Sequence, residues 1–276
     1  MSDFPSPEEK RALQLEELTA LLELKRLCDL HGLRYYLIAG TLLGAVRHGG
    51  FIPWDDDVDV AMPRADYDKL AKIARRELST GFFYQTASTE KNCPFFFAKI
   101  RKDGTSVTEE IVKGVDMHDG CYVDIFPLDV CPRSAERAER YFKLTRMIYC
   151  AIISKLNPDF VCEYTKKSAI AAFKAMRVLP ISVMKAFRGA VRRWYTLTSH
   201  KGKLCTVDGS YGYPKESYPD EWFAKADTMK FEGHDLPVPS AWDELLTHMY
   251  GDYMTPPDES ARRGHFIKTI PTEDDR

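Results

Sequence analysis

Four aspartates fall within five residues, at Asp55, Asp56, Asp57 and Asp59, directly after Trp54. Carboxylates packed this closely repel one another, and the repulsion raises their pKa values unless a cation lies among them. Hard oxygen ligands on a short extended segment suit Mg²⁺, with Mn²⁺ as the alternative ion. The segment therefore predicts a divalent-metal site for chemistry on phosphate groups.

The spacing of the aspartates indicates which of them act together. Alternate side chains of a strand share a face, so Asp55, Asp57 and Asp59 should point one way and the intervening valines toward the core. We expect a strand over Asp57–Ala61, with Asp55 just before its start and Asp56 pointing away from the face that the other aspartates share.

A solvated acidic loop and an EF-hand both fit the acidic segment less well than a phosphate-linked metal site. A solvated loop would not need valines in alternation with the aspartates. An EF-hand loop beginning at Asp55 would require glycine at its sixth position and glutamate at its twelfth, where this chain has Val60 and Asp66. The pattern therefore favours the metal site.

A Gly-Thr pair, Gly40 and Thr41, precedes the aspartates by fifteen residues. The β-rich run Arg34–Ala39 leads into the pair, and the helix-forming run Gly40–Arg47 follows, which predicts a strand, a glycine turn and a short helix. Gly40 would let a phosphate approach the backbone, and Thr41 could cap the helix or bond a phosphate oxygen. The free N–H groups at the helix N-terminus would also attract an anion.

A third acidic element is Asp124, which interrupts the apolar run between Cys121 and Leu128. A carboxylate in such a strand is costly to bury without a partner. Taken alone it would be an edge or turn residue bonded to backbone, but the neighbouring acidic segment favours a shared metal site held by Asp57, Asp59 and Asp124. Asp129 is predicted to be a turn residue or the cap of the next helix.

Four stretches of the chain resemble the LicD phosphotransferases, the phosphorylcholine transferases related to fukutin. They lie at Tyr36–Tyr67, Phe97–Arg101, His118–Asp129 and Tyr250–Met254, the last followed by a Pro-Pro pair. The resemblance covers nearly the whole chain, although residues 133–205 carry no motif that can be aligned.

This resemblance implies an α+β fold of nucleotidyltransferase type, in which helices flank a mixed sheet. Gly40 and Thr41 would form the turn, Asp57 and Asp59 the metal pair, and Asp124 the third carboxylate. It further implies a CDP-activated donor such as CDP-choline, with CMP as the leaving group. The acceptor would be a hydroxyl of a cell-surface glycan, such as teichoic acid or lipopolysaccharide, or of its lipid-linked precursor.

In the expected reaction the metal would bridge the donor's diphosphate and align the acceptor for in-line attack. Asp55 or Asp124 could accept the acceptor's proton. Secondary candidates for contacts with the substrate phosphates or for proton transfer are Arg47, His48, Lys99, Arg101 and His118. Each of these alone is more often an ordinary packed or surface residue.

Composition is consistent with a cytoplasmic enzyme. The seven cysteines include no Cys-x-x-Cys pair, which favours reduced thiols, and no secretory signal precedes the first helix. That helix should begin after Ser6, with Glu9 completing a capping box, and end at Gly32. Residues 250–254 are expected to be a helix end that closes over the domain without a catalytic role.

Three regions are predicted: a catalytic core over 1–132, a basic helical region over 133–205 and a C-terminal part over 206–276 that packs on the core. Residues 137–203 contain fifteen Lys and Arg against three acids, so the rest of this chain of net charge −2 is strongly acidic. The basic helices could contact an anionic membrane at its inner face or a phosphate-rich acceptor, or be solvated helix faces. No nucleic-acid partner is expected.

Three rival functions stay open at this point. A metal-dependent glycosyltransferase also uses an Asp-x-Asp pair, although the Gly-Thr turn argues against it. A related enzyme could transfer a polyol phosphate such as ribitol phosphate. The non-enzymatic alternative is a membrane-surface binding module with a degenerate metal site, against which the carboxylates at 57, 59 and 124 argue.

Overall fold

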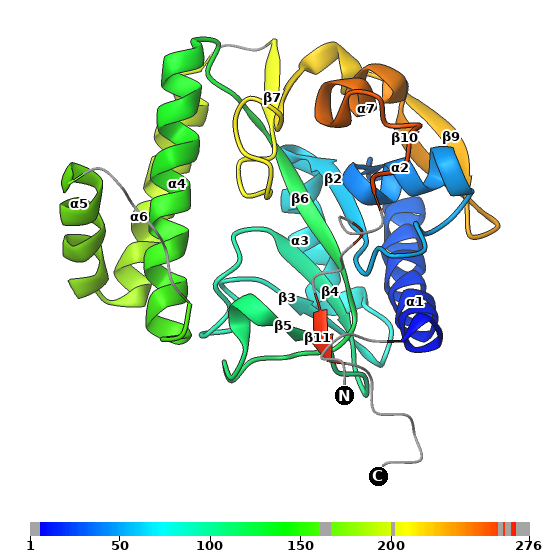
Figure 1. The fold of residues 1–276 in the computed structure, drawn as a ribbon, viewed down its shortest axis with the longest axis horizontal. Coiled ribbons are helices and arrows are strands. Elements are labelled where there is room, and N and C mark those ends of the chain that lie inside the picture. Colours follow the sequence, from blue (N-terminus) through cyan, green and yellow to red (C-terminus); the bar gives the residue numbers. More distant parts are fainter. Residues whose placement is uncertain (1–5, 161–166, 200–201, 259–261, 263–265, 269–276) are drawn as a thin grey trace.

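The computed structural model describes residues 6–160, 167–199, 202–258, 262 and 266–268, and these form an α+β fold with seven α-helices (Figure 1). The first helix, α1 (Pro7–His31), begins as predicted. Ser6 accepts a hydrogen bond from the Glu9 backbone N–H, and the Glu9 side chain accepts one from the Ser6 backbone. Gly32 ends the helix in the left-handed region, at φ 60°.

The central sheet is mixed, as expected. Its strands lie in the order β1-β2-β6-β4-β3. In addition, β7 pairs with the C-terminal end of β6, and β8 pairs with β7. Among the described strands, only β2 and β6 run parallel; the other neighbours are antiparallel. The bounds are β1 (Tyr36–Leu37), β2 (Asp59–Pro63), β3 (Phe82–Gln85), β4 (Ala98–Lys102), β6 (Tyr122–Val130), β7 (Lys203–Cys205) and β8 (Ser217–Pro219).

Three predicted boundaries are wrong, two of them next to the Gly-Thr pair and one in the acidic segment. The first strand ends at Leu37 and helix α2 (Ala39–His48) already begins before Gly40, so the pair lies in the first helical turn. Ala39 adopts φ +50°, a left-handed conformation that breaks the extended run and costs a non-glycine residue about 1–2 kcal/mol. The second strand starts at Asp59 instead of Asp57.

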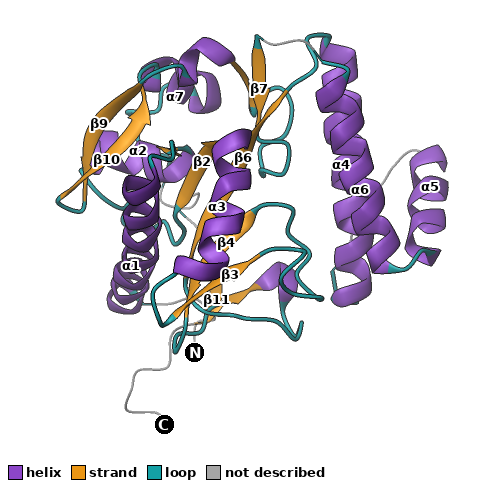
Figure 2. Cartoon of the chain, turned by 180° about the vertical axis from the view of Figure 1, so that it is seen from behind, coloured by secondary structure: helices purple, strands orange, loops and turns teal. Residues whose placement is uncertain are grey.

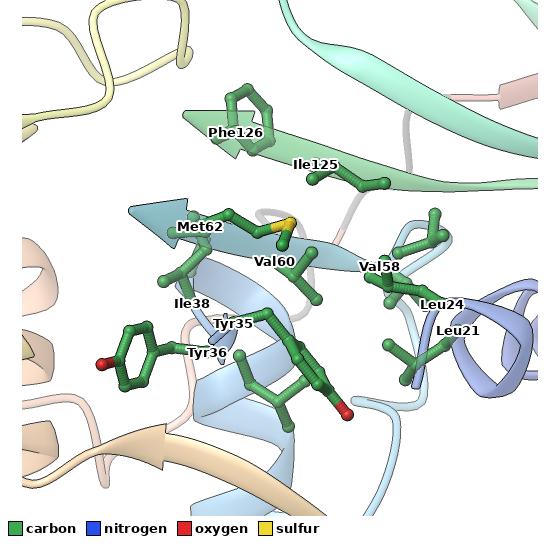
Figure 3. Packing of buried hydrophobic residues seen from close by; sticks show 14 of the residues in the cluster. Leu21, Leu24, Tyr35, Tyr36, Ile38, Val58, Val60, Met62, Ile125 and Phe126 are labelled. Atoms are coloured by element: carbon green, nitrogen blue, oxygen red, sulfur yellow. The ribbon is translucent and has the colours of Figure 1, made fainter. Parts of the chain in front are cut away.

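Helices α1 and α3 (Arg64–Glu77) cover one face of the sheet, which Figure 2 shows from behind. Val58 and Val60 are fully buried on this face, and Val58 lies beside Leu21 and Leu24 of α1 (Figure 3). Burial of a valine or leucine side chain contributes about 1.5–3 kcal/mol. The valine alternation that was predicted to face the core is therefore confirmed.

The basic region forms α4 (Ala135–Leu156), α5 (Lys167–Val178) and α6 (Ile181–Leu197), which stand beside the sheet (Figure 1). Buried side chains of α4 and α6 make a second apolar cluster with Cys131, Cys205 and Val207. Basic side chains of this region also bind groups within the protein. Lys185 donates to two backbone carbonyls, and Arg188 is buried against Asp208. No described helix is both long and apolar enough to cross a bilayer.

The C-terminal part packs on the core. Hairpin β9 (Ala226–Phe231) and β10 (His234–Pro239) and helix α7 (Trp242–Tyr250) lie near α2, and the Tyr36 hydroxyl donates to the Phe223 carbonyl at 2.8 Å. Strand β5 (Thr108–Glu109) pairs with β11 (Phe266–Lys268), and short 3₁₀ turns occupy Glu110–Val112 and Asp220–Phe223. The six described cysteines are all free thiols. The boundaries of the three regions stay predictions.

Candidate active site

The acidic segment alternates in burial as its spacing predicted. Asp55, Asp57 and Asp59 are half-buried, whereas Asp56 is fully buried together with the two valines. Since Val60 lies on the face of the sheet that α1 covers, its neighbour in β2, Asp59, faces the opposite side. Asp59 is the direct partner of Asp124 in the parallel ladder. The structure thus brings carboxylates from β2 and β6 together on one face.

The Gly-Thr pair holds the acidic segment in place. Thr41 is buried, and its hydroxyl accepts the Asp59 backbone N–H at 2.8 Å. Gly40 packs against the Asp55 carboxylate so closely that a Cβ at this position would lie 2.4 Å from Asp55 Oδ2. Glycine at position 40 is therefore needed for the Asp55 carboxylate to approach the first turn of α2.

The carboxylates perturb one another strongly. Burial raises the pKa of Asp59 well above its usual range, and the charges of Asp57, Asp124 and Asp55 raise it further. Burial also raises the pKa of Asp124 to about 7, although Lys99 opposes the shift. Such a cluster favours a bound cation at neutral pH.

Lys99 is the cation that the fold itself supplies. It is 1% exposed, and its Nζ lies 2.8 Å from Asp124 Oδ1 and 3.3 Å from Glu109 Oε2. The same ammonium lies 3.3 Å from the centre of the Tyr122 ring. Lys99 therefore reaches the candidate site, where it is already bonded to two carboxylates, and its predicted contact with a substrate diphosphate stays a prediction.

Arg101, the second strand candidate for contact with substrate phosphate, is engaged by other groups of the protein. Its guanidinium is fully buried and donates to Gln85, to the Gly120 carbonyl and to Glu109. With these three donors engaged inside the protein, Arg101 supports Glu109 instead of facing solvent.

His118 also lies outside the acidic cluster. Its ring stacks on Phe83 at 5.1 Å, and its Nε2 lies 2.9 Å from Asp103. Its Nδ1 accepts the Gly120 N–H. These contacts fix the turn before β6, so His118 is not placed for proton transfer at Asp59 or Asp124.

Arg47 and His48 lie at the end of α2 near Trp54. Arg47 donates to the Tyr253 carbonyl at 2.8 Å, and its guanidinium lies 5.7 Å from the Trp54 ring centre. Burial and the charge of Arg262 lower the pKa of Arg47, while Asp55 opposes this. Burial and Arg47 lower the pKa of His48, which favours its neutral form. Both residues are at the rim of the site.

Two tyrosines beside the acidic cluster were not anticipated as site residues. The Tyr211 hydroxyl donates to the Tyr250 hydroxyl at 3.1 Å, and their rings meet edge to face. Burial raises the pKa of both, and the charges of Asp59 and Asp55 add to this. Tyr250 was assigned a purely structural role, whereas its hydroxyl lies within electrostatic range of the site. In the sequence, only the motif at 250–254 could have indicated that Tyr250 lies near the site.

Asp129 is also different from the prediction. It belongs to β6, is 1% exposed, and receives two hydrogen bonds of 2.7 Å from Arg64. The arginine of this bidentate pair lies 65 residues away in the sequence. The sequence alone could therefore not distinguish the pair from a turn or cap role of Asp129. Asp129 therefore ties β6 to α3.

Without substrate, the carboxylates of the site supply only part of the coordination that a hard divalent ion requires. Among the described residues, no three acid, histidine or cysteine side chains converge on one point, so the predicted set of Asp57, Asp59 and Asp124 is not preformed. Mg²⁺, however, is commonly held by one or two carboxylates together with waters and substrate phosphates. The crowded carboxylates at Asp59 and Asp124 fit that arrangement.

The fold and site define an α+β enzyme with an acidic centre on its sheet. Residues 32–139 match the family model described as LicD/FKTN/FKRP, nucleotidyltransferase domain. The chain is 31% identical over 265 residues to the lipopolysaccharide cholinephosphotransferase LicD of Haemophilus influenzae, covering 94% of this chain and 96% of that one. It is 39% identical over 61 residues to the human ribitol 5-phosphate transferase FKRP, covering 20% and 12%.

These relationships place the protein among the phosphotransferases. The chain belongs to the LicD family, as its four motifs predicted.

Proposed function

We propose that the enzyme transfers phosphocholine from a CDP-activated donor such as CDP-choline to a hydroxyl of a cell-surface glycan or its lipid-linked precursor, with release of CMP. The observation that carries this proposal is the match to the cholinephosphotransferase, which extends over nearly the whole of both chains. The acidic centre supports it because phosphoryl transfer depends on positioning and on charge stabilisation.

Asp59 and a neighbouring carboxylate, Asp57 or Asp124, would hold a Mg²⁺ or Mn²⁺ ion that offsets the negative charge developing on the leaving CMP. Thr41 fixes the backbone of Asp59, and Lys99 orients the Asp124 carboxylate. Asp124 or Asp55 would accept the proton of the acceptor hydroxyl. The pKa of Asp124, raised to about 7 mainly by burial, lies in the range that suits a general base.

The second candidate is transfer of ribitol phosphate, favoured by the 61-residue match to FKRP. Because that match covers 20% of this chain and 12% of FKRP, it supports the family relationship more than the choice of head group. To decide, the purified protein should be incubated with Mg²⁺, lipopolysaccharide and either CDP-choline or CDP-ribitol, and release of CMP measured. CMP release with CDP-choline alone supports the proposal, and release with CDP-ribitol alone contradicts it.

Peripheral contact with an anionic membrane is part of the proposal. Helix α6 exposes four large apolar side chains along one stripe, and the exposed Arg193 lies beside this stripe. The stripe consists of Val183 (46% exposed), Phe187 (43%), Trp194 (65%) and Leu197 (74%). Apolar side chains next to arginines are typical of helices that lie in a lipid interface.

Replacing Trp194 with glutamate should lower binding to vesicles that contain anionic phosphatidylglycerol by about tenfold, since the change removes an aromatic anchor and adds a repelled charge. Co-sedimentation measures this, with purely zwitterionic vesicles as the reference lipid. Leu30→Glu, at an exposed leucine of α1, is the control and should leave binding unchanged. Equal losses in both variants would argue against a specific role of α6.

A further inference from the structure

A pocket lies between the sheet and the basic helical region. Helix α4 contributes Arg146 and Tyr149, the segment before β4 contributes Phe96 and Phe97, and the loop between β7 and β8 contributes Asp208. Figure 1 shows that loop between α4 and β6. The pocket is open to solvent, and its walls combine aromatic rings with one cation and one anion. That combination is typical of sites that hold a planar polar ligand.

The pocket adjoins the acidic centre on the same face of the sheet. The Phe97 ring lies 4.4 Å from that of Phe126, which is two residues beyond Asp124 on β6. Phe97 also lies 5.4 Å from the Nζ of Lys99, the ammonium that contacts Asp124. A ligand in the pocket could therefore extend toward the carboxylates of β2 and β6.

The Asp208 carboxylate is held in one orientation. The buried guanidinium of Arg188, 2% exposed, donates to both Asp208 oxygens at 2.7 and 2.8 Å. Arg188 lies 5.1 Å from the ring centre of Phe96. Burial of an ion pair is costly and often no more stabilising than an apolar contact. The arrangement does, however, fix the Asp208 carboxylate and leaves its oxygens capable of accepting a further hydrogen bond.

Arg146 is exposed at the pocket edge and makes no ion pair within the described part of the chain. Its guanidinium lies 5.6 Å from the Tyr149 ring centre. A planar guanidinium in this position can bind two phosphate oxygens at once.

We propose that this pocket binds the nucleotide half of the donor and selects cytosine over uracil, with Asp208 accepting a hydrogen bond from the 4-amino group of the base. Cytosine offers a donor at position 4 and uracil an acceptor, so a fixed carboxylate distinguishes them. Phe97 and Tyr149 contact the ring, and Arg146 contacts the phosphate. This inference rests on the proposed function in that it takes the donor to be a nucleotide.

The test uses CMP and UMP as probes in isothermal titration calorimetry of the full chain with Mg²⁺. Wild-type protein should bind CMP about tenfold or more tighter than UMP, since one hydrogen bond to the wrong base discriminates by about this factor. Asp208→Asn should lose that preference or reverse it, because the amide can donate to the uracil 4-oxygen. Asp235→Asn, at an exposed residue of the β9–β10 hairpin, is the control and should keep it.

Arg146→Ala gives an independent readout, since an exposed side chain can be removed without disturbing the fold. It should weaken CMP and UMP binding by a similar factor of about ten and leave their ratio unchanged. Arg140→Ala, on the same helix, is its control. Equal affinity of the wild type for CMP and UMP, or an unchanged preference in a folded Asp208→Asn protein, would overturn the inference.

The outcomes also separate this inference from the proposed function. Transfer from CDP-choline together with an unchanged base preference in Asp208→Asn contradicts the pocket alone. Selective CMP binding that depends on Asp208, without transfer from CDP-choline, supports the pocket and contradicts the phosphocholine assignment.

Discussion

Replacing Asp59 with asparagine should lower the turnover of the enzyme by about 10³-fold or more, because a neutral amide binds a divalent cation much more weakly than a carboxylate does. Each factor of ten corresponds to about 1.4 kcal/mol of transition-state stabilisation. The measurement is CMP release at saturating CDP-choline and Mg²⁺. Asparagine keeps the shape of the side chain, so Thr41 should still accept the backbone N–H of residue 59.

The same variant should be more stable than the wild type in the absence of divalent cations. The pKa of Asp59 is raised by burial and by neighbouring carboxylates, so the native state binds the proton more tightly than the unfolded chain. Stability then falls as pH rises through the unfolded value, 3.8, toward the raised native pKa. Above this pH range the wild type is destabilised by the ionised Asp59 carboxylate, whereas asparagine never ionises.

Thermal unfolding in EDTA from pH 5 to 9 measures this difference, with Asp227→Asn, an exposed residue of β9, as the control. Added Mg²⁺ should raise the melting temperature of the wild type but not of Asp59→Asn. A variant with near-normal turnover, or with an undiminished response to Mg²⁺, would refute the metal-site argument.

Local patterns in the sequence predicted much of the acidic centre. The alternation of aspartate and valine determined which side chains share a face, and the capping residues determined both ends of α1. Asp124 could be paired with this segment because a single carboxylate in an apolar strand needs a partner. The parallel β2–β6 register then placed it directly opposite Asp59.

What could not be predicted depends on contacts between distant segments. Arg101 resembles an ordinary strand cation in the sequence, and only the positions of Gln85, Gly120 and Glu109 show that it is buried. Tyr211 lies in the loop between β7 and β8 without a motif, and its position follows from the pairing of β7 with β6. Asp129 and Arg64 likewise meet across 65 residues.

Lys99→Met should lower the free energy of unfolding by about 3–5 kcal/mol, because removal of one member of a buried ionic group leaves the others uncompensated. Methionine fills a similar volume among the surrounding aromatic rings. Two carboxylates, Asp124 and Glu109, would lose their nearest ammonium. Urea unfolding at pH 7.5 measures the loss, and Lys225→Met, at an exposed lysine, controls for loss of charge alone.

The origin of that loss can be tested by a second change and by pH. Burial opposes ionisation of Glu109, yet Lys99 and Arg101 lower its pKa below its usual value of 4.5. Its ionised form therefore contributes stability above pH 4.5, and this is lost as pH falls through the lowered native pKa. Adding Glu109→Gln to Lys99→Met should recover part of the stability at pH 7.5, and the defect of Lys99→Met should shrink in acid. A loss below about 1 kcal/mol, or a double variant whose defects simply add, would mean that Lys99 and Glu109 are not energetically coupled.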